Sequence, residues 1–209
     1  GSPVALYLAA AGVGEMHLAD FDTIDTSNLQ RQILHDSQSE GILKAQSAKT
    51  RLAAINPLVK ISVHEKKLDK QDLFTLVKDM DLVLDCTDNF TIRDQINAAC
   101  IASKTAWISA AAIQLQGQLT LFDSSSDNSP CYRCLYGSEN KNNSDCNQSG
   151  VLGPLVGVIG SLQAAEAIKK LTGLGSSLLG KLLIIDLYGY KFQEFKISRD
   201  PQCSACAKK

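Results

Sequence analysis

Residues 16–64 read MHLADFDTIDTSNLQRQILHDSQSEGILKAQSAKTRLAAINPLVKISVH, and this stretch decides the fold class. Its pattern predicts a strand over Met16–Ala19, a helix over Gly41–Ile55 and a second strand over Lys60–His64. A helix between two short strands is typical of a right-handed crossover that joins parallel strands. The stretch therefore predicts an α/β protein built on a parallel sheet.

The alternation of strands and helices continues on both sides of this stretch, up to residue 110. Helices are predicted over residues 3–11, 69–78 and 91–104, and strands over 82–84 and 106–110. Beyond residue 110 the pattern favours strands over 116–122, 182–185 and 191–197, with a long buried helix over 153–172. We expect one domain over residues 1–209, with a mixed sheet that is parallel in its first half and antiparallel in its second, and with helices on both faces.

Composition limits the classes of function. The 209 residues are 44% hydrophobic and 21% charged, and the formal net charge is −1. Such a chain can bury an ordinary core, and its charge provides no field that would attract nucleic acid. The longest uncharged run, residues 146–165, contains four glycines and a proline, which makes it a poor membrane span. Seven cysteines without a secretory leader favour a reducing, cytoplasmic compartment.

Polar side chains gather just after the first predicted strand. Asp20 ends this strand, the following loop carries Asn28, Gln30 and Arg31, and Lys44 lies on the next helix. A carboxylate in this place can bind ribose hydroxyls, while amides and cations can hold phosphate oxygens. These residues predict a site for a nucleoside triphosphate. A solvated loop, and an exposed helix face for Lys44, are the alternatives.

A second polar run, Asp85-Cys86-Thr87-Asp88-Asn89, follows the strand over residues 82–84. Ligands of open α/β sheets bind beyond the carboxyl ends of the strands. Asp88 is predicted to hold Mg²⁺ on the phosphates, and its alternative role is the N-cap of the next helix. Asp85 is interpreted as a structural acid, and Cys86 is expected in the core.

The strand and Gly-rich turn that open a nucleotide-binding unit do not precede the first helix. Gly1 fits the last glycine of such a turn, because Asp20 follows it at nearly the usual spacing, but Gly1-Ser2 also fits a cloning scar. An empty strand position would leave the neighbouring strands without ladder partners. We therefore expect residues 1–209 to be a fragment of a longer polypeptide.

Two pairs of cysteines predict a metal centre. Cys131-Tyr-Arg-Cys134 and Cys203-Ser-Ala-Cys206 each present two thiolates from one tight turn, and together they complete a tetrahedral structural zinc site. A redox-active pair is the alternative. Cys146 lies in a polar segment and is either a nucleophile or a spectator thiol. The three histidines form no cluster in the sequence, so no histidine metal site is expected.

These motifs together resemble the ThiF/MoeB/HesA family, the bacterial relatives of ubiquitin-activating enzymes. The resemblance covers essentially the whole chain. It is carried by residues 1–8, Asp20-Phe21-Asp22, Ser27-Asn28-Leu29-Gln30-Arg31-Gln32, Lys44, Leu84-Asp85-Cys86-Thr87-Asp88-Asn89, residues 157–164 and both cysteine pairs.

The resemblance implies a Rossmann-like fold and an adenylyltransferase activity. In the family, the C-terminal Gly-Gly carboxylate of a ubiquitin-like sulfur carrier attacks the α-phosphate of Mg-ATP and releases pyrophosphate. By position, Asp20 resembles the ribose acid and Asp88 the catalytic, magnesium-binding carboxylate. Asn28, Gln30, Arg31 and Lys44 resemble the phosphate ligands, with Gly1 and Asn89 beside the cofactor. Cys146 matches the cysteine that bonds to the carrier in ThiF-type members.

The resemblance further implies a homodimer, and a separate protein as sulfur donor, since no rhodanese segment follows Cys206. The particular residues in these motifs favour a ThiF-type enzyme of thiamin thiazole synthesis. MoeB-type activation of the molybdopterin synthase small subunit is the alternative. An NAD-binding module and a non-enzymatic carrier-binding protein are alternatives of other classes.

Overall fold

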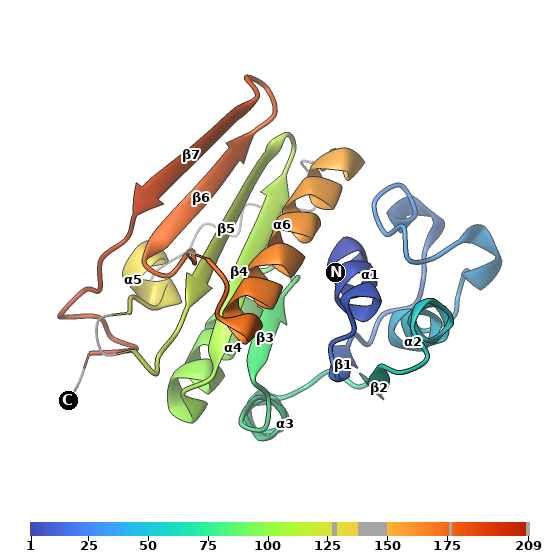
Figure 1. Ribbon diagram of the computed structural model, residues 1–209, viewed down its shortest axis with the longest axis horizontal. Helices are drawn as coiled ribbons and strands as arrows, with labels where there is room; N and C mark the ends of the chain where they lie inside the picture. The colour runs from blue at the N-terminus through green and yellow to red at the C-terminus, as the bar shows by residue number, and fades with distance from the viewer. Residues whose placement is uncertain (127–128, 138–149, 176, 208–209) are drawn as a thin grey trace.

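The structure is a computed structural model that describes residues 1–126, 129–137, 150–175 and 177–207 (Figure 1). The helices of the first half are α1 (Ser2–Ala11), α2 (Lys44–Ile55), α3 (Lys70–Val77) and α4 (Phe90–Ser103), and those of the second half are α5 (Tyr132–Tyr136) and α6 (Gly153–Thr172). The strands are β1 (Glu15–Ala19), β2 (Lys60–His64), β3 (Leu82–Asp85), β4 (Ala106–Ile113), β5 (Gln116–Phe122), β6 (Lys181–Asp186) and β7 (Lys191–Lys196).

The strands form two sheets. Parallel strands β1 and β2 form one, and the other has the order β3-β4-β5-β6-β7, in which β3 and β4 are parallel and the remaining pairs are antiparallel. The prediction of a mixed sheet is therefore confirmed. Within the part of the chain that the structure describes, neither β1 nor β3 pairs with a second strand. The sequence predicts unpaired strand edges of this kind.

Helices cover both faces of the larger sheet, and β4 shows why. Its alternate side chains enter two different apolar clusters. Ile108 packs with residues of α1 and α6, whereas Trp107 packs with α4 and α5 and lies 5.0 Å, between ring centroids, from Phe122 of β5. Figure 1 shows α6 running along the larger sheet with α1 beside it.

Local signals explain most of the boundaries. Asp69 accepts a hydrogen bond from the Asp72 N–H, so it caps α3 as the sequence predicts. Helix α2 begins at Lys44 rather than Gly41, because Gly41 has a φ of 78° and Leu43 forms a β-bridge with Thr23. The sequence did not predict the short helix α5. Of the helices described, none combines the length and apolar character needed to cross a membrane.

Candidate functional site

The end of β1 brings Asp20 and Lys44 into one small cluster. The Asp20 carboxylate accepts a hydrogen bond from the Asp22 N–H at 3.0 Å. Asp22 in turn forms an ion pair with Lys44, with 2.9 Å between Oδ2 and Nζ, and its backbone carbonyl accepts from the Lys44 N–H. Only 11% of the Lys44 side chain is exposed, which argues against its reading as part of a solvated helix face.

The loop after β1 folds into an internally bonded turn around Asn28. The Asn28 side-chain oxygen accepts hydrogen bonds from Arg31 Nη2 at 3.0 Å and from Gln32 Nε2 at 3.3 Å. Arg31 Nη1 also donates to the carbonyl of Ser27. Gln30 is exposed, and its backbone lies against Gly153 at the start of α6. The turn therefore holds Arg31 in a fixed orientation before any ligand binds.

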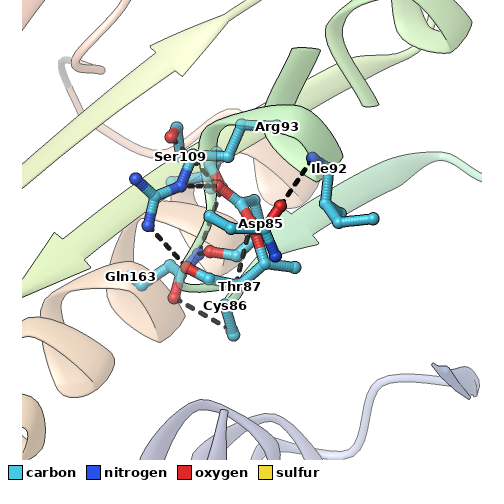
Figure 2. Close-up of polar contacts among 9 residues, drawn as sticks. Asp85, Cys86, Thr87, Ile92, Arg93, Ser109 and Gln163 are labelled. Atoms are coloured by element: carbon cyan, nitrogen blue, oxygen red, sulfur yellow. Dashed lines mark hydrogen bonds and ion pairs between the residues drawn. The ribbon is translucent and has the colours of Figure 1, made fainter. Parts of the chain in front are cut away.

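A buried polar network supports the loop that follows β3 (Figure 2). Asp85 is 1% exposed, and its Oδ2 lies 3.3 Å from Nε of the buried Arg93. Ser109 donates a hydrogen bond to the same carboxylate. Burial raises the pKa of Asp85, while Arg93 and the hydrogen bonds from Thr87 and Ser109 oppose this shift. Arg93 also donates to the Thr87 carbonyl. Asp85 thus has the structural environment that the sequence predicts.

Asp88 and Asn89 lie at the start of α4. Asp88 is exposed. The predicted alternative, in which Asp88 caps α4, is wrong, because Asn89 is the N-cap and its side-chain oxygen accepts from the Ile92 N–H at 2.9 Å. Asn89 therefore has only its NH₂ group left to offer a ligand.

The start of α1 lies beside the same loop. A Cβ added to Gly1 would stand 3.7 Å from the Cβ of Cys86. Cys86 is exposed, so its expected place in the core is wrong; as the residue after β3 it lies outside the apolar strand. Cys100, by contrast, is buried, and burial raises its pKa to about 12.

Two cavities among the described residues lie away from the predicted nucleotide site. One, of about 150 Å³, lies beside the cysteine pairs and is lined by Asn97, Trp107 and Arg199 among others. A second follows β6 and β7. Neither is lined by Asp20, Arg31, Lys44 or Asp88. Asp20, Lys44 and Asp88 lie at the ends of strands and helices, at the carboxyl end of β1 and at the starts of α2 and α4.

The four paired cysteines do converge. Their Sγ atoms lie within 4.8 Å of one another, with 3.6 Å between Cys131 and Cys203 and 3.5 Å between Cys134 and Cys206. A tetrahedral zinc site with bonds of about 2.3 Å separates its sulfur atoms by about 3.8 Å. The geometry of the cluster therefore suits a four-thiolate metal centre.

The surroundings of the cluster favour the thiolate of Cys203, whereas burial raises the pKa of Cys131 and of Cys206. The Asp200 N–H donates to Cys134 Sγ at 3.4 Å. Burial would raise the pKa of Cys203, but backbone hydrogen bonds from Ala205 and Cys206 outweigh it and lower this pKa to about 7. Arg133 connects the two pairs to α4, because it donates to Ser204 and to Asp94.

Five further residues complete the comparison with the sequence. Cys146 lies outside the described residues. Two of the three histidines, far apart in the sequence, meet in the structure, because the β1–β2 pairing places His17 Nδ1 3.0 Å from His64 Nε2. No motif in the sequence gave Arg93 a role, and Gln163 appeared only within the run 157–164 that carries the family resemblance. Gln163 carried a usable signal, because an amide within the apolar run of α6 needs a buried partner.

Comparison with known proteins agrees with this description. The model of the ThiF family matches residues 1–205. Molybdopterin-synthase adenylyltransferase of Escherichia coli (strain K12) is 47% identical over 206 residues, which are 99% of this chain and 82% of that protein. Adenylyltransferase and sulfurtransferase MOCS3 of Drosophila yakuba is 40% identical over 210 residues, which are 99% of this chain and 46% of that protein.

Among solved structures, E. coli MccB with ATP superposes with a TM-score of 0.86 and 26% identity, over 100% of this chain and 64% of that chain. The chain thus spans less than two thirds of MccB and about half of MOCS3. The names of the curated relatives bear out the predicted enzyme class, an adenylyltransferase. The chain belongs to the ThiF family.

Proposed function

We propose that this chain adenylates the C-terminal Gly-Gly carboxylate of a ubiquitin-like sulfur carrier, and that the carrier is the small subunit of a molybdopterin synthase. One observation carries the choice of carrier: the 47% identity to a molybdopterin-synthase adenylyltransferase over 82% of its length. The sequence motifs alone favoured the thiamin carrier. The comparisons favour the molybdopterin alternative, since curated relatives that are 47%, 46% and 43% identical carry that name.

The proposed chemistry is a displacement at phosphorus. The carrier carboxylate attacks the α-phosphorus of ATP, the bond to the bridging oxygen breaks, and pyrophosphate leaves with the electron pair. Positioning and neutralisation of charge are the main contributions that a protein makes to such a transfer. Arg31 and Lys44 supply positive charge, Asn28 and Gln30 supply neutral hydrogen-bonding groups, and Asp20 binds the ribose.

The environment of Lys44 supports its role. Its side chain is nearly buried, and its ammonium group is paired with Asp22. An incoming phosphate oxygen would bind this ammonium group either in place of the Asp22 carboxylate or together with it. Asp88, exposed at the start of α4, is the proposed ligand of Mg²⁺, which would neutralise charge on the phosphates. Gly1, which lies beside Cys86 at the start of α1, and the NH₂ group of Asn89, at the start of α4, complete the proposed nucleotide contacts.

Three further roles belong to the proposal. The four paired cysteines hold a structural zinc ion. Cys146 would form a thioester with the carrier in a ThiF-type enzyme, where its thiolate attacks the acyl adenylate and AMP leaves, whereas the equivalent thiol is dispensable in MoeB-type members. For the proposed molybdopterin-type carrier, Cys146→Ala should therefore leave carrier adenylation unchanged in denaturing mass spectrometry. The protein forms a homodimer and receives sulfur from a separate donor, and light scattering of the purified protein tests the dimer.

Carrier-dependent exchange of pyrophosphate into ATP tests the main proposal. We expect the full-length protein to catalyse exchange with a molybdopterin-type carrier and far less with a thiamin-type carrier. Lys44→Ala should lower exchange strongly, whereas Lys49→Ala, on the exposed face of the same helix, should not. Exchange with the thiamin-type carrier alone would overturn the choice of carrier. Carrier binding without exchange would favour the non-enzymatic reading.

A further inference from the structure

Helix α6 touches three segments that surround the proposed nucleotide site. At its first residue, a Cβ added to Gly153 would stand 2.3 Å from the backbone oxygen of Gln30. Two turns later, a Cβ on Gly160 would stand 2.9 Å from the Cβ of Pro3, in the first turn of α1. Gln163 then reaches Asp85 at the end of β3.

Both polar atoms of the Gln163 amide group form hydrogen bonds, and two of these three bonds go to the start of the loop that carries Asp88. The Gln163 side chain is 1% exposed. Nε2 donates to the carbonyl of Asp85 at 2.9 Å and to that of Ile108 at 3.1 Å, while Oε1 accepts from Cys86 Sγ at 3.5 Å. Figure 2 shows Gln163 reaching from α6 to Asp85 and Cys86. The amide thus ties the end of β3 and the interior of β4 to the helix.

The two contacts at Gly153 and Gln163 are ten residues apart on one unbroken helix. At 1.5 Å per residue, they are separated by about 15 Å along its axis. A helix packed into a core does not change this length. It therefore fixes the distance between the turn that carries Gln30 and Arg31 and the loop that carries Asp88.

We propose that Gly153 and Gln163 are positioning residues for the adenylation site, where α6 holds the phosphate-binding turn at one contact and the Asp88 loop at the other. This inference rests on the proposed function, because it takes Arg31 and Asp88 as groups that act on the same nucleotide. Neither positioning residue has to touch the substrate.

A matched pair of substitutions on α6 separates positioning from packing. Gly153→Ala and Gly157→Ala make the same change in the same helix, where alanine is the better helix former. A Cβ at Gly157 meets nothing within 4 Å. At Gly153 the obstacle is a main-chain carbonyl, so the Gln30–Arg31 turn or the first turn of α6 has to move.

The test measures kcat and KM for ATP in carrier-dependent pyrophosphate exchange, with the thermal midpoint of each variant. We expect Gly157→Ala to behave as wild type. Gly153→Ala should lower kcat on the order of 10- to 100-fold, because displaced reacting groups are costly. It should also lower the thermal midpoint, since backbone rather than a flexible side chain has to move, so kcat is measured well below the midpoint of both variants. Hydrogen exchange of the amides of residues 26–33 should rise in Gly153→Ala alone. Equal kcat values in the two variants would overturn the inference.

Gln163→Met tests the second contact, because methionine has a similar length and no hydrogen-bond donor. Ile159→Val is its control, since Ile159 is buried on the same helix and lies against Gly117 of β5. We expect kcat to fall in Gln163→Met and to stay near wild type in Ile159→Val. If wild type itself exchanges no pyrophosphate with either carrier, the proposed function fails, and the hydrogen-exchange comparison still decides whether α6 positions the turn.

Discussion

Among single residues, the buried pair of Asp85 and Arg93 has the largest predicted effect on stability. Both side chains are at most 8% exposed. Removing one partner leaves the other charge buried without compensation, which costs about 3–5 kcal/mol. We expect losses of this size for Asp85→Ala and for Arg93→Ala, measured by urea unfolding.

The double variant tests whether the two groups act as a pair. Its loss should be clearly smaller than the sum of the two single losses, because no unpaired charge then remains. Should Asp85→Ala fail to fold, Asp85→Asn supplies a milder first step. Strictly additive losses would mean that the two groups contribute independently.

Asp123 gives a pH-dependent prediction. Burial would raise its pKa, but hydrogen bonds from Lys170 and Ser125 outweigh burial and lower it. A carboxyl with a lowered folded-state pKa adds stability above its unfolded pKa of about 3.9, and this contribution disappears as the pH falls through the folded value. The difference in unfolding free energy between wild type and Asp123→Asn should therefore be steady near neutral pH and shrink below about pH 4. A difference that grows toward acid pH would contradict it.

At the level of secondary-structure elements, substitutions of Asn89 distinguish its role as the cap of α4 from its proposed role in binding the nucleotide. Its side-chain oxygen caps α4, and loss of such a cap costs about 1 kcal/mol. Asn89→Ala should lose this stability, whereas Asn89→Asp should keep it, since a carboxylate also caps. If the NH₂ group also contacts the nucleotide, Asn89→Asp will raise KM for ATP while the thermal midpoint stays near wild type. An unchanged KM would limit Asn89 to its cap.

The sequence predicted elements well where one local signal decides them. The bounds of β2, β5 and α6 agree with the prediction, because hydrophobic alternation or a long apolar run ends at a turn residue. The cap of α4 was predicted one residue early, since Asp88 and Asn89 are both good caps. Helix α5 was missed, because its five residues depend on a distant partner: the Tyr132 N–H donates to Asn97 of α4.

The candidate site was only partly predictable for the same reason. Each polar run after a strand was found, because such runs are local in sequence. The contacts that connect them were not found: Gln163 with Asp85, Gly153 with Gln30, and His17 with His64 join residues far apart in the chain. Strand register and helix packing determine such contacts, and periodicity within a single segment does not reveal either.

At the scale of the whole molecule, the cysteine cluster joins the end of the described chain to its body. Cys131 is the N-cap of α5 and Cys134 lies within it, and the other two cysteines come after β7, 72 residues later. Arg133 adds an ion pair with Asp94 of α4. A metal at this cluster would therefore hold α5, α4 and the segment after β7 together.

Removal of the metal gives the last prediction. We expect one zinc ion per chain by elemental analysis, and Cys131→Ser and Cys203→Ser should each release it. Structural zinc contributes about 10–16 kcal/mol in small peptides. The effect on the free energy of unfolding should be smaller here, because the cores around Trp107 and Ile108 are built without it.

The two substitutions combined should destabilise the protein little more than either alone, because one lost ligand already opens the site. Cys86→Ser is the control, since this exposed cysteine lies outside the cluster and should leave the zinc content unchanged. A protein that contains no zinc and forms a disulfide between Cys131 and Cys134 would instead support the redox alternative. In that case the segment after β7 would have no covalent or metal link to the body, and its amides should exchange hydrogen faster than those of β6.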